Sequence, residues 1–192
     1  MSLRRRLAAV ALAAALADCA APATSRTAAT APAATKPAAP IESRISPRFI
    51  GLVGPKLAHD PPFLGVAATN FYTLRSLLDR ATGESVTQLY VSDSYFGAER
   101  GWDGAHDAAG RKLRFNHIST DRIACDGGCA YAEEFAATLP EAVLHADEAE
   151  VSITFTARSG ATMTIRLSRP LIAAQLAAIE AARRRPPAAA SP

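Results

Sequence analysis

Cysteine is scarce in this chain, with three of 192 residues, and this scarcity limits metal and disulfide chemistry. Cys125 and Cys129 form a C-x3-C pair, while Cys19 stands alone near the start. No second cysteine or histidine pair lies at ligand spacing, which argues against a zinc site. The spacing also differs from that of C-x-x-C redox pairs. In an oxidising compartment, a structural disulfide between Cys125 and Cys129 is the favoured interpretation.

Recognisable catalytic motifs are missing as well. The sequence has no G-x-S-x-G elbow, no glycine-rich phosphate loop and no H-E-x-x-H motif. Its four histidines, at positions 59, 106, 117 and 145, do not pair at ligand spacing on a common expected element. We therefore assign no catalytic residue, no metal and no cofactor, and the sequence favours a non-enzymatic protein.

The chain also lacks a strong charge of one sign. Its formal net charge is +3, and residues 1–18 contain three arginines and one aspartate, so the remainder stands at about +1. A further arginine triplet, at 183–185, lies near the other end. The body of the chain is thus close to neutral, which gives no electrostatic footprint for nucleic acid.

The first feature that is present is an export signal. Three arginines at 4–6 precede an apolar run, Leu7 to Ala17, that is too short to span a bilayer permanently. The run ends in L-A-D-C at residues 16–19, which resembles the lipobox of bacterial lipoproteins. This resemblance implies that residues 1–18 are a signal peptide and that Cys19 is acylated, for example with palmitate. Ordinary signal-peptidase cleavage after Ala17 is the alternative.

The same resemblance implies a location. A lipid-anchored protein of the cell envelope is expected, and Ala20 after the cysteine is similar to the outer-membrane default, on the periplasmic face. The alternative is a soluble periplasmic or secreted protein. The expected partners are the membrane, through the lipid, and another envelope protein. Residues 19–44, rich in Ala, Pro and Thr, predict a disordered tether with a reach of at most ~75 Å.

Residues 45–182 predict a single, mainly β domain, followed by a disordered tail over 183–192. Apolar residues alternate strictly in 151–155 and again in 163–167, which predicts a β-hairpin. In this hairpin the apolar residues of the second strand, Met163, Ile165 and Leu167, lie across the turn from those of the first, Val151, Ile153 and Phe155. Residues 69–79 fit either a helix or a strand, and we favour a strand. After Pro170 the spacing of the apolar residues changes from that of a strand to that of a helix, so a helix is expected there. The predicted fold is an antiparallel meander of about seven or eight strands, a sandwich or an open barrel, with one C-terminal helix.

The segment around Cys125 and Cys129 predicts a β-hairpin, because Asp126-Gly127-Gly128 suits a tight reversal. Opposed cysteines would place Ile123 across from Tyr131 and Asp121 across from Glu133. Carboxylates that face each other directly are destabilising. Two interpretations follow: a bulge at the turn that shifts the register, which we favour, or a cation site formed by Asp121, Glu133 and His117.

One stretch carries the features of a recognition surface. Aromatic residues and charges gather there, and exposed aromatics beside polar groups are common in binding sites. The candidate residues are Tyr95, Phe96, Arg100, Trp102 and Asp103. Alternatively, Tyr95 and Trp102 complete the core. The sequence thus favours a membrane-tethered, non-enzymatic envelope module that binds a partner or has a structural role. The alternative is a small-ligand or cation carrier with its site between sheet and helix.

Overall fold

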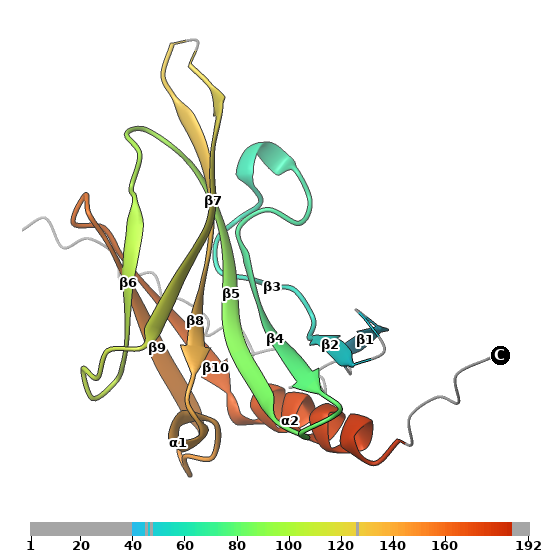
Figure 1. The fold of residues 1–192 in the computed structure, drawn as a ribbon. Helices are drawn as coiled ribbons and strands as arrows, with labels where there is room; N and C mark the ends of the chain where they lie inside the picture. Colours follow the sequence, from blue (N-terminus) through green and yellow to red (C-terminus); the bar gives the residue numbers. More distant parts are fainter. Residues whose placement is uncertain (1–39, 45, 47, 126, 186–192) are drawn as a thin grey trace, which may run out of the picture. The chain divides into compact units, whose positions relative to one another are not determined.

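The computed structural model describes residues 40–44, 46, 48–125 and 127–185. These residues form two antiparallel sheets and a C-terminal helix (Figure 1). The predicted fold class is confirmed: the protein is mainly β, with a sandwich of open sheets and one long helix. The predicted signal peptide, Cys19 and the tail beyond residue 185 lie outside the described residues.

The larger sheet has seven strands, in the order β1-β2-β4-β5-β8-β7, with β3 paired to β4. Its strands are β1 (Ile41–Arg44), β2 (Phe49–Val53), β3 (Leu57–Ala58), β4 (Phe71–Asp79), β5 (Ser85–Phe96), β7 (Arg114–Ala124) and β8 (Ala130–Leu139). The strand predicted over 69–79 is therefore confirmed as β4. β1 lies within the range 19–44 that was predicted as tether, so ordered pairing begins earlier than expected.

The smaller sheet has three strands in the order β10-β9-β6. They are β6 (Trp102–Asp107), β9 (Glu150–Ala157) and β10 (Thr162–Ser168). The predicted hairpin is confirmed in its register, because Met163 pairs with Phe155, Ile165 with Ile153 and Leu167 with Val151.

Helical structure is confined to short pieces and one amphipathic helix. α2 (Arg169–Arg183) begins with Pro170 in its first turn, where a missing N–H costs nothing. Residues 140–144, expected as a loop or short strand, instead contain α1 (Glu141–Leu144), and a 3-10 turn, η1, covers Phe63–Gly65. Across the described ranges, no helix is both long and apolar enough to cross a membrane.

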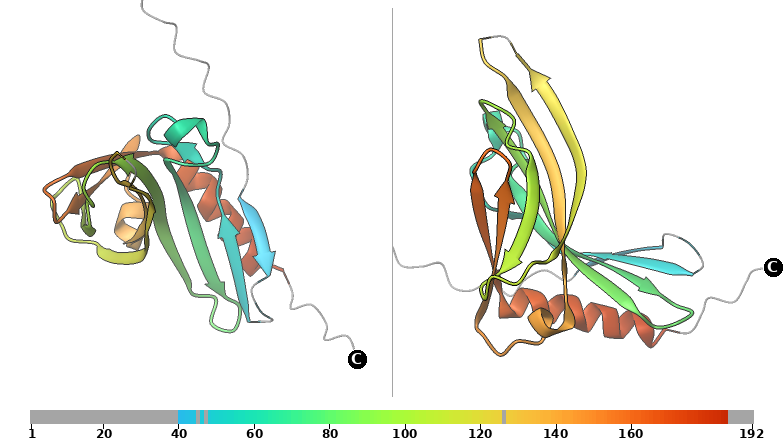
Figure 2. Two further views of the ribbon diagram at one scale, coloured as in Figure 1. Left: turned by 90° about the horizontal axis from the view of Figure 1, so that it is seen from above. Right: turned by 60° about the vertical axis from the view of Figure 1, so that its left-hand side comes forward.

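The core lies on one face of the larger sheet. At the β5–β8–β7 end this face packs against the smaller sheet, through residues such as Phe135 and Phe155, whose ring centroids are 4.9 Å apart. At the β2–β4 end it packs against α2, where Ile50, Leu52 and Ile179 are buried together (Figure 2). Gln175 of α2 is also buried, and its Nε2 donates to the carbonyl of Leu52 at 3.0 Å. Two different layers therefore share one sheet face, and the opposite face carries neither.

Candidate functional site

The predicted recognition surface divides into buried and exposed parts. Tyr95 and Trp102 are buried, Arg100 is partly buried, and Phe96 and Asp103 are exposed. For Tyr95 and Trp102 the core interpretation is correct, and the prediction that they form an exposed surface is wrong. The physical reason is a buried acceptor that the sequence did not reveal.

That acceptor is Glu133 of β8, whose carboxylate is fully buried on the core face. Its Oε1 accepts hydrogen bonds from the backbone N–H of Arg100 at 3.1 Å and of Gly101 at 3.0 Å, and from the Tyr95 hydroxyl. Its Oε2 accepts from the backbone N–H of Trp102 at 3.1 Å. A buried carboxylate is tolerated when donors surround it, and Glu133 has four of them.

A second buried carboxylate, Asp93, lies directly opposite Glu133 in the β5–β8 register. Asp93 Oδ2 accepts from Trp102 Nε1 at 3.0 Å and from Arg100 Nη1 at 2.6 Å. The Arg100 guanidinium also lies over the Tyr95 ring, 3.9 Å from its centroid. We call these five residues the carboxylate knot. Their two acidic groups face each other, and separate sets of donors make this arrangement stable.

Burial raises the pKa of Tyr95 well above its usual value of 10.0, and the hydrogen bond to Glu133 raises it further. The hydroxyl therefore remains a donor to Glu133 throughout the physiological range. Because the knot holds the backbone of residues 100–102, it fixes the segment that carries the chain from the larger sheet to the smaller one. The acidic oxygens are directed at the protein's own groups, so this arrangement serves the fold.

The three residues considered for a cation site are not brought together. Glu133 pairs with Thr120, and Asp121 pairs with Ala132, so the predicted Asp121–Glu133 pair is wrong. The register shift between Arg122 and Ala124 is the reason, so a bulge is present as the favoured alternative expected, but it lies in β7 and not at the double glycine of the turn. His117 instead contacts Thr120, with 2.9 Å between Nε2 and Oγ1. In the part of the chain that the structure describes, no group of three His, Cys, Asp or Glu residues is placed to hold a metal ion.

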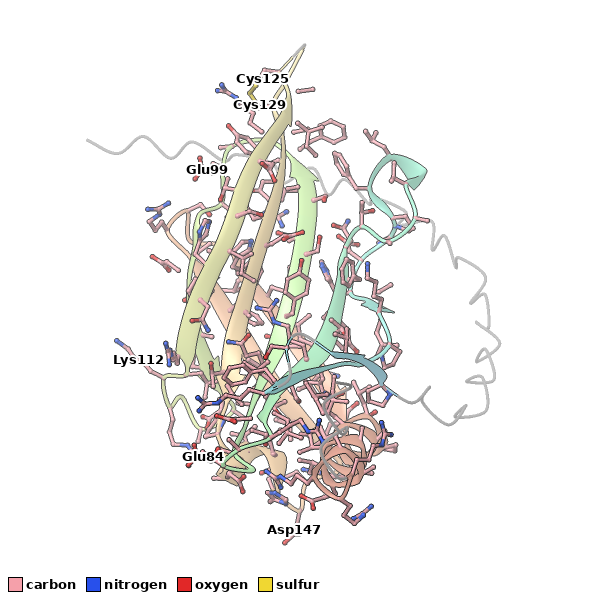
Figure 3. All side chains as sticks on the ribbon, turned by 45° about the vertical axis from the view of Figure 1, so that its right-hand side comes forward. Glu84, Glu99, Lys112, Cys125, Cys129 and Asp147 are labelled. Atoms are coloured by element: carbon pink, nitrogen blue, oxygen red, sulfur yellow. A yellow bond between two sulfur atoms is a disulfide. The ribbon has the colours of Figure 1, made fainter. Side chains whose placement is uncertain are left out.

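The predicted disulfide is present. Cys125 and Cys129 are bonded at the tip of the β7–β8 hairpin, with their Cα atoms 4.0 Å apart (Figure 3). The bond closes a loop of three residues, and the chain-entropy model gives so short a loop roughly 2 kcal/mol of stabilisation. It therefore acts as a local staple of the hairpin tip.

Exposed apolar side chains gather on two segments of the larger sheet. Leu64 and Val66, in the segment between β3 and β4, are 71% and 56% exposed, and Phe96 at the end of β5 is 63% exposed. The ring of Phe63 links the two segments, because its centroid lies 4.7 Å from that of Phe96. We call Leu64, Val66 and Phe96 the apolar loop end. Large apolar side chains grouped in solvent are a feature of interaction surfaces.

Side-chain hydrogen bonds from Thr69 and Asn70 hold this segment in place. Thr69 Oγ1 accepts from the backbone N–H of Phe63 at 2.8 Å and donates to the carbonyl of Val66 at 2.7 Å. Asn70 is buried, and its Nδ2 donates to the carbonyl of Pro61 at 2.9 Å. Its Oδ1 accepts from the backbone N–H of Ser94 in β5 at 2.6 Å, which ties the loop to the sheet.

The backbone of this loop is strained. Leu64, Ala68 and Asn70 have φ values of 52°, 61° and 52°, in the left-handed region that favours glycine. For a bulky residue such as Leu64 this conformation costs of order 1–2 kcal/mol. Strain of this kind persists where the surrounding structure over-determines it, and Thr69 and Asn70 supply that constraint.

A groove does lie between sheet and helix, where the alternative carrier function would place a ligand. Its volume is about 270 Å³, below the usual size of ligand pockets. Its charged rim is already paired: His145 Nε2 lies 3.5 Å from Glu141 Oε2, and Arg183 bonds both Glu180 and the Ser85 hydroxyl. The groove therefore offers little chemistry to an incoming ligand.

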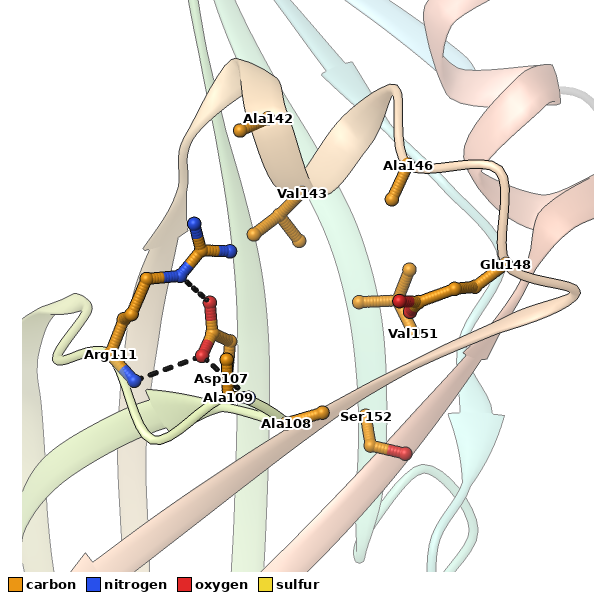
Figure 4. A pocket seen from close by; sticks show the side chains of 10 residues that line it. All are labelled: Asp107, Ala108, Ala109, Arg111, Ala142, Val143, Ala146, Glu148, Val151 and Ser152. Carbon is orange, nitrogen blue, oxygen red and sulfur yellow. Dashed lines mark hydrogen bonds and ion pairs between the residues drawn. The ribbon is translucent and has the colours of Figure 1, made fainter.

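A smaller hollow of about 70 Å³ lies between α1 and the turn after β6 (Figure 4). Asp107 lines it, with Oδ1 accepting from the backbone N–H groups of Ala109 and Arg111 and Oδ2 accepting from Arg111 Nε at 2.7 Å. Burial raises the pKa of Asp107, but these bonds to Arg111 and Ala109 outweigh burial, so the net pKa is below normal. The carboxylate closes a turn.

Comparison with known proteins gives no relative: no protein-family model, curated protein or solved structure matches the chain. The site must therefore be judged from its own geometry. Of the apolar loop end, the sequence pattern predicted only Phe96 as a candidate surface residue, and Leu64 and Val66 were not predicted. The signal was an apolar run, Phe63-Leu64-Gly65-Val66, placed directly after Pro61-Pro62 and too short for a core strand.

Proposed function

We propose that this chain is a non-enzymatic binding module of the cell envelope, held at the membrane by an acylated Cys19 that precedes the Ala/Pro/Thr-rich segment. Its binding surface is the apolar loop end, and its ligand is another envelope protein. The export signal and the lipobox-like L-A-D-C support the location. The exposed Leu64, Val66 and Phe96 support the binding role.

One observation carries the proposal: the chain uses side-chain hydrogen bonds, including those of the buried Asn70, to hold apolar side chains in water. Asn70 and Thr69 fix the loop, and Leu64 keeps an unfavourable backbone conformation at its tip. Neither feature improves the core, because Leu64 and Val66 lie outside it. Rigid presentation reduces the entropy lost when a partner binds, and this is the physical benefit of pre-organisation.

The charges around the loop end favour a protein partner over a lipid surface. Asp60 is exposed in the segment that carries Leu64 and Val66; Glu99, in the segment after Phe96, is also exposed, and its Oε1 lies 3.7 Å from Arg158 Nη2. Surfaces that insert into anionic membranes carry Lys and Arg at this position. The expected partner therefore offers an apolar socket with basic groups on its rim.

The test is partner capture from the envelope with matched variants. A photo-crosslinkable residue at position 67, which is exposed beside Val66, should yield a defined protein adduct, and Leu64→Ser with Phe96→Ser should reduce its capture at least about tenfold. Leu77→Ser is the control, since Leu77 is also an exposed apolar residue but lies on another part of the sheet. Loss of the adduct in the control as well, or its retention in the double variant, would contradict the proposal.

A second measurement separates the protein partner from the bilayer. The chain without its lipid should show no binding to vesicles of mixed neutral and anionic phospholipid. Vesicle binding that disappears in the Leu64→Ser, Phe96→Ser variant would assign the surface to the membrane instead.

A further inference from the structure

The face of the larger sheet that carries neither α2 nor the smaller sheet has an apolar hollow at its β2–β4–β5 end. Its volume is about 390 Å³. The register places Leu77 beside both Gly51 and Val86, and Arg75 beside both Val53 and Gln88. Val53, Leu77 and Val86 are each more than a third exposed. Three aliphatic side chains thus line a depression whose floor includes Gly51.

One cation stands at the side of this hollow. Arg75 is partly buried, its Nε donates to Gln88 Oε1 at 3.0 Å, and its guanidinium lies 4.8 Å from the centre of the Tyr90 ring. Among the described residues, its two terminal nitrogens make no hydrogen bond. Burial lowers the pKa of Arg75, although Tyr90 and Glu134 act against this. The guanidinium is therefore charged, partly dehydrated and short of acceptors.

One acidic side chain, Glu134, acts on Arg75 through space and raises its pKa, but among the described residues no hydrogen bond joins the two side chains. Burial, and next the presence of Glu134, raise the pKa of Tyr90. Glu134 therefore does not supply the missing hydrogen bonds of Arg75. An acceptor with two oxygens in one plane fits the open side of a guanidinium.

We propose that this hollow binds a single-chain alkyl carboxylate, such as a free fatty acid. The carboxylate forms a paired hydrogen bond with the terminal nitrogens of Arg75, and the alkyl chain covers Val53, Leu77 and Val86. This site is separate from the apolar loop end, and it stands whether or not that surface binds a protein.

Calorimetric titration of the full chain with sodium decanoate tests the site. We expect saturable binding with one equivalent, and about tenfold weaker binding for Arg75→Gln, because the charge-assisted pair is lost. Arg114→Gln is the matched control: Arg114 lies on the same row of the same face, across β8, but away from the hollow. Decanoate affinity unchanged in Arg75→Gln, or reduced equally in Arg114→Gln, would overturn the proposal.

Two further measurements fix the orientation and the place. Decyltrimethylammonium, with the same chain and the opposite charge, should bind at least about tenfold more weakly than decanoate. Glu134→Gln should tighten decanoate binding, since it removes the negative charge that acts on Arg75. Equal binding of both amphiphiles would show that Arg75 does not select the head group, and the proposal would fail.

Methyl resonances provide the location. Decanoate should shift the signals of Val53, Leu77 and Val86 and leave those of Leu64 and Val66 in place; the reverse pattern would overturn the proposal. Val86→Trp keeps the test valid if Arg75→Gln does not fold, because a large side chain at this half-exposed position fills the hollow. It should abolish decanoate binding, and unchanged binding would exclude this site.

Discussion

The carboxylate knot and the apolar loop end meet at two consecutive residues, Tyr95 and Phe96, and they are built in opposite ways. The knot places charged groups inside and gives every one a partner from the same chain. The loop end places apolar groups outside and strains the backbone of Leu64 to do so. Both depart from the usual distribution of polar and apolar residues.

The difference indicates where each region finds its partner. Glu133 and Asp93 have their hydrogen bonds satisfied within the fold, so the knot is explained by stability alone. Leu64 and Val66 lie outside the core, and Phe96 is exposed apart from its ring contact with Phe63, so we infer that their explanation lies outside the chain. A buried polar cluster with complete pairing is thus weaker evidence of function than an exposed apolar cluster with rigid support.

The largest expected effect is at the centre of the knot. Glu133→Ala leaves the backbone N–H groups of Gly101 and Trp102 and the Tyr95 hydroxyl without their acceptor, and we expect a loss of about 3 kcal/mol or more in the free energy of unfolding. Urea denaturation measures it. Glu134→Ala, on the opposite face of the same strand, is the control and should cost less than about 1 kcal/mol. Equal losses for the two variants would mean that Glu133 contributes no more to the free energy of unfolding than Glu134 does.

A smaller effect is expected where the two regions are joined. Asn70→Ala leaves the N–H of Ser94 and the carbonyl of Pro61 unpaired, and we expect a loss of about 2 kcal/mol in stability. Partner capture through the loop end should fall as well, because the loop is no longer held rigid. Asn116→Ala, which removes a long surface contact, serves as the comparison. If Asn70→Ala lowers stability but leaves partner capture intact, binding through the apolar loop end does not depend on the hydrogen bonds of Asn70.

The smallest effect has the opposite sign. Leu64→Gly relieves the left-handed conformation at a position with little packing, and we expect the protein to become more stable by about 1 kcal/mol. Partner capture should decrease at the same time, which thermal unfolding and crosslinking measure together. A less stable Leu64→Gly variant would show that Leu64 contributes to the fold, and the contrast between the two regions would disappear.

Local patterns were sufficient to predict much of the fold. Strict alternation in β9 and β10 gave both strands and their register, because one face is apolar and the other polar. The Asp-Gly-Gly turn gave the β7–β8 hairpin and its disulfide. α1 was missed because four residues are too short for a periodic signal.

The site was harder to predict because its contacts are distant in sequence. Glu133 reaches residues 31 to 38 positions earlier, and nothing in its local pattern marks it as buried. Tyr95 and Trp102 looked like recognition residues for the same reason, since only the sheet pairing shows which way they face. The strain at Leu64 could not be predicted from the sequence, because it is visible only in the backbone φ angle.

The placement of β6 has a consequence for the order of folding. Its strand partner, β9, follows it in sequence by more than forty residues, and the carboxylate that fixes its approach, Glu133, also comes later. β6 therefore cannot form its strand pairing when it is first synthesised. The two sheets can pack together only after the second half of the chain has been made. Until β9 becomes available, residues 102–107 lack their strand partner, which makes this an interval in which the folding chain is open to aggregation.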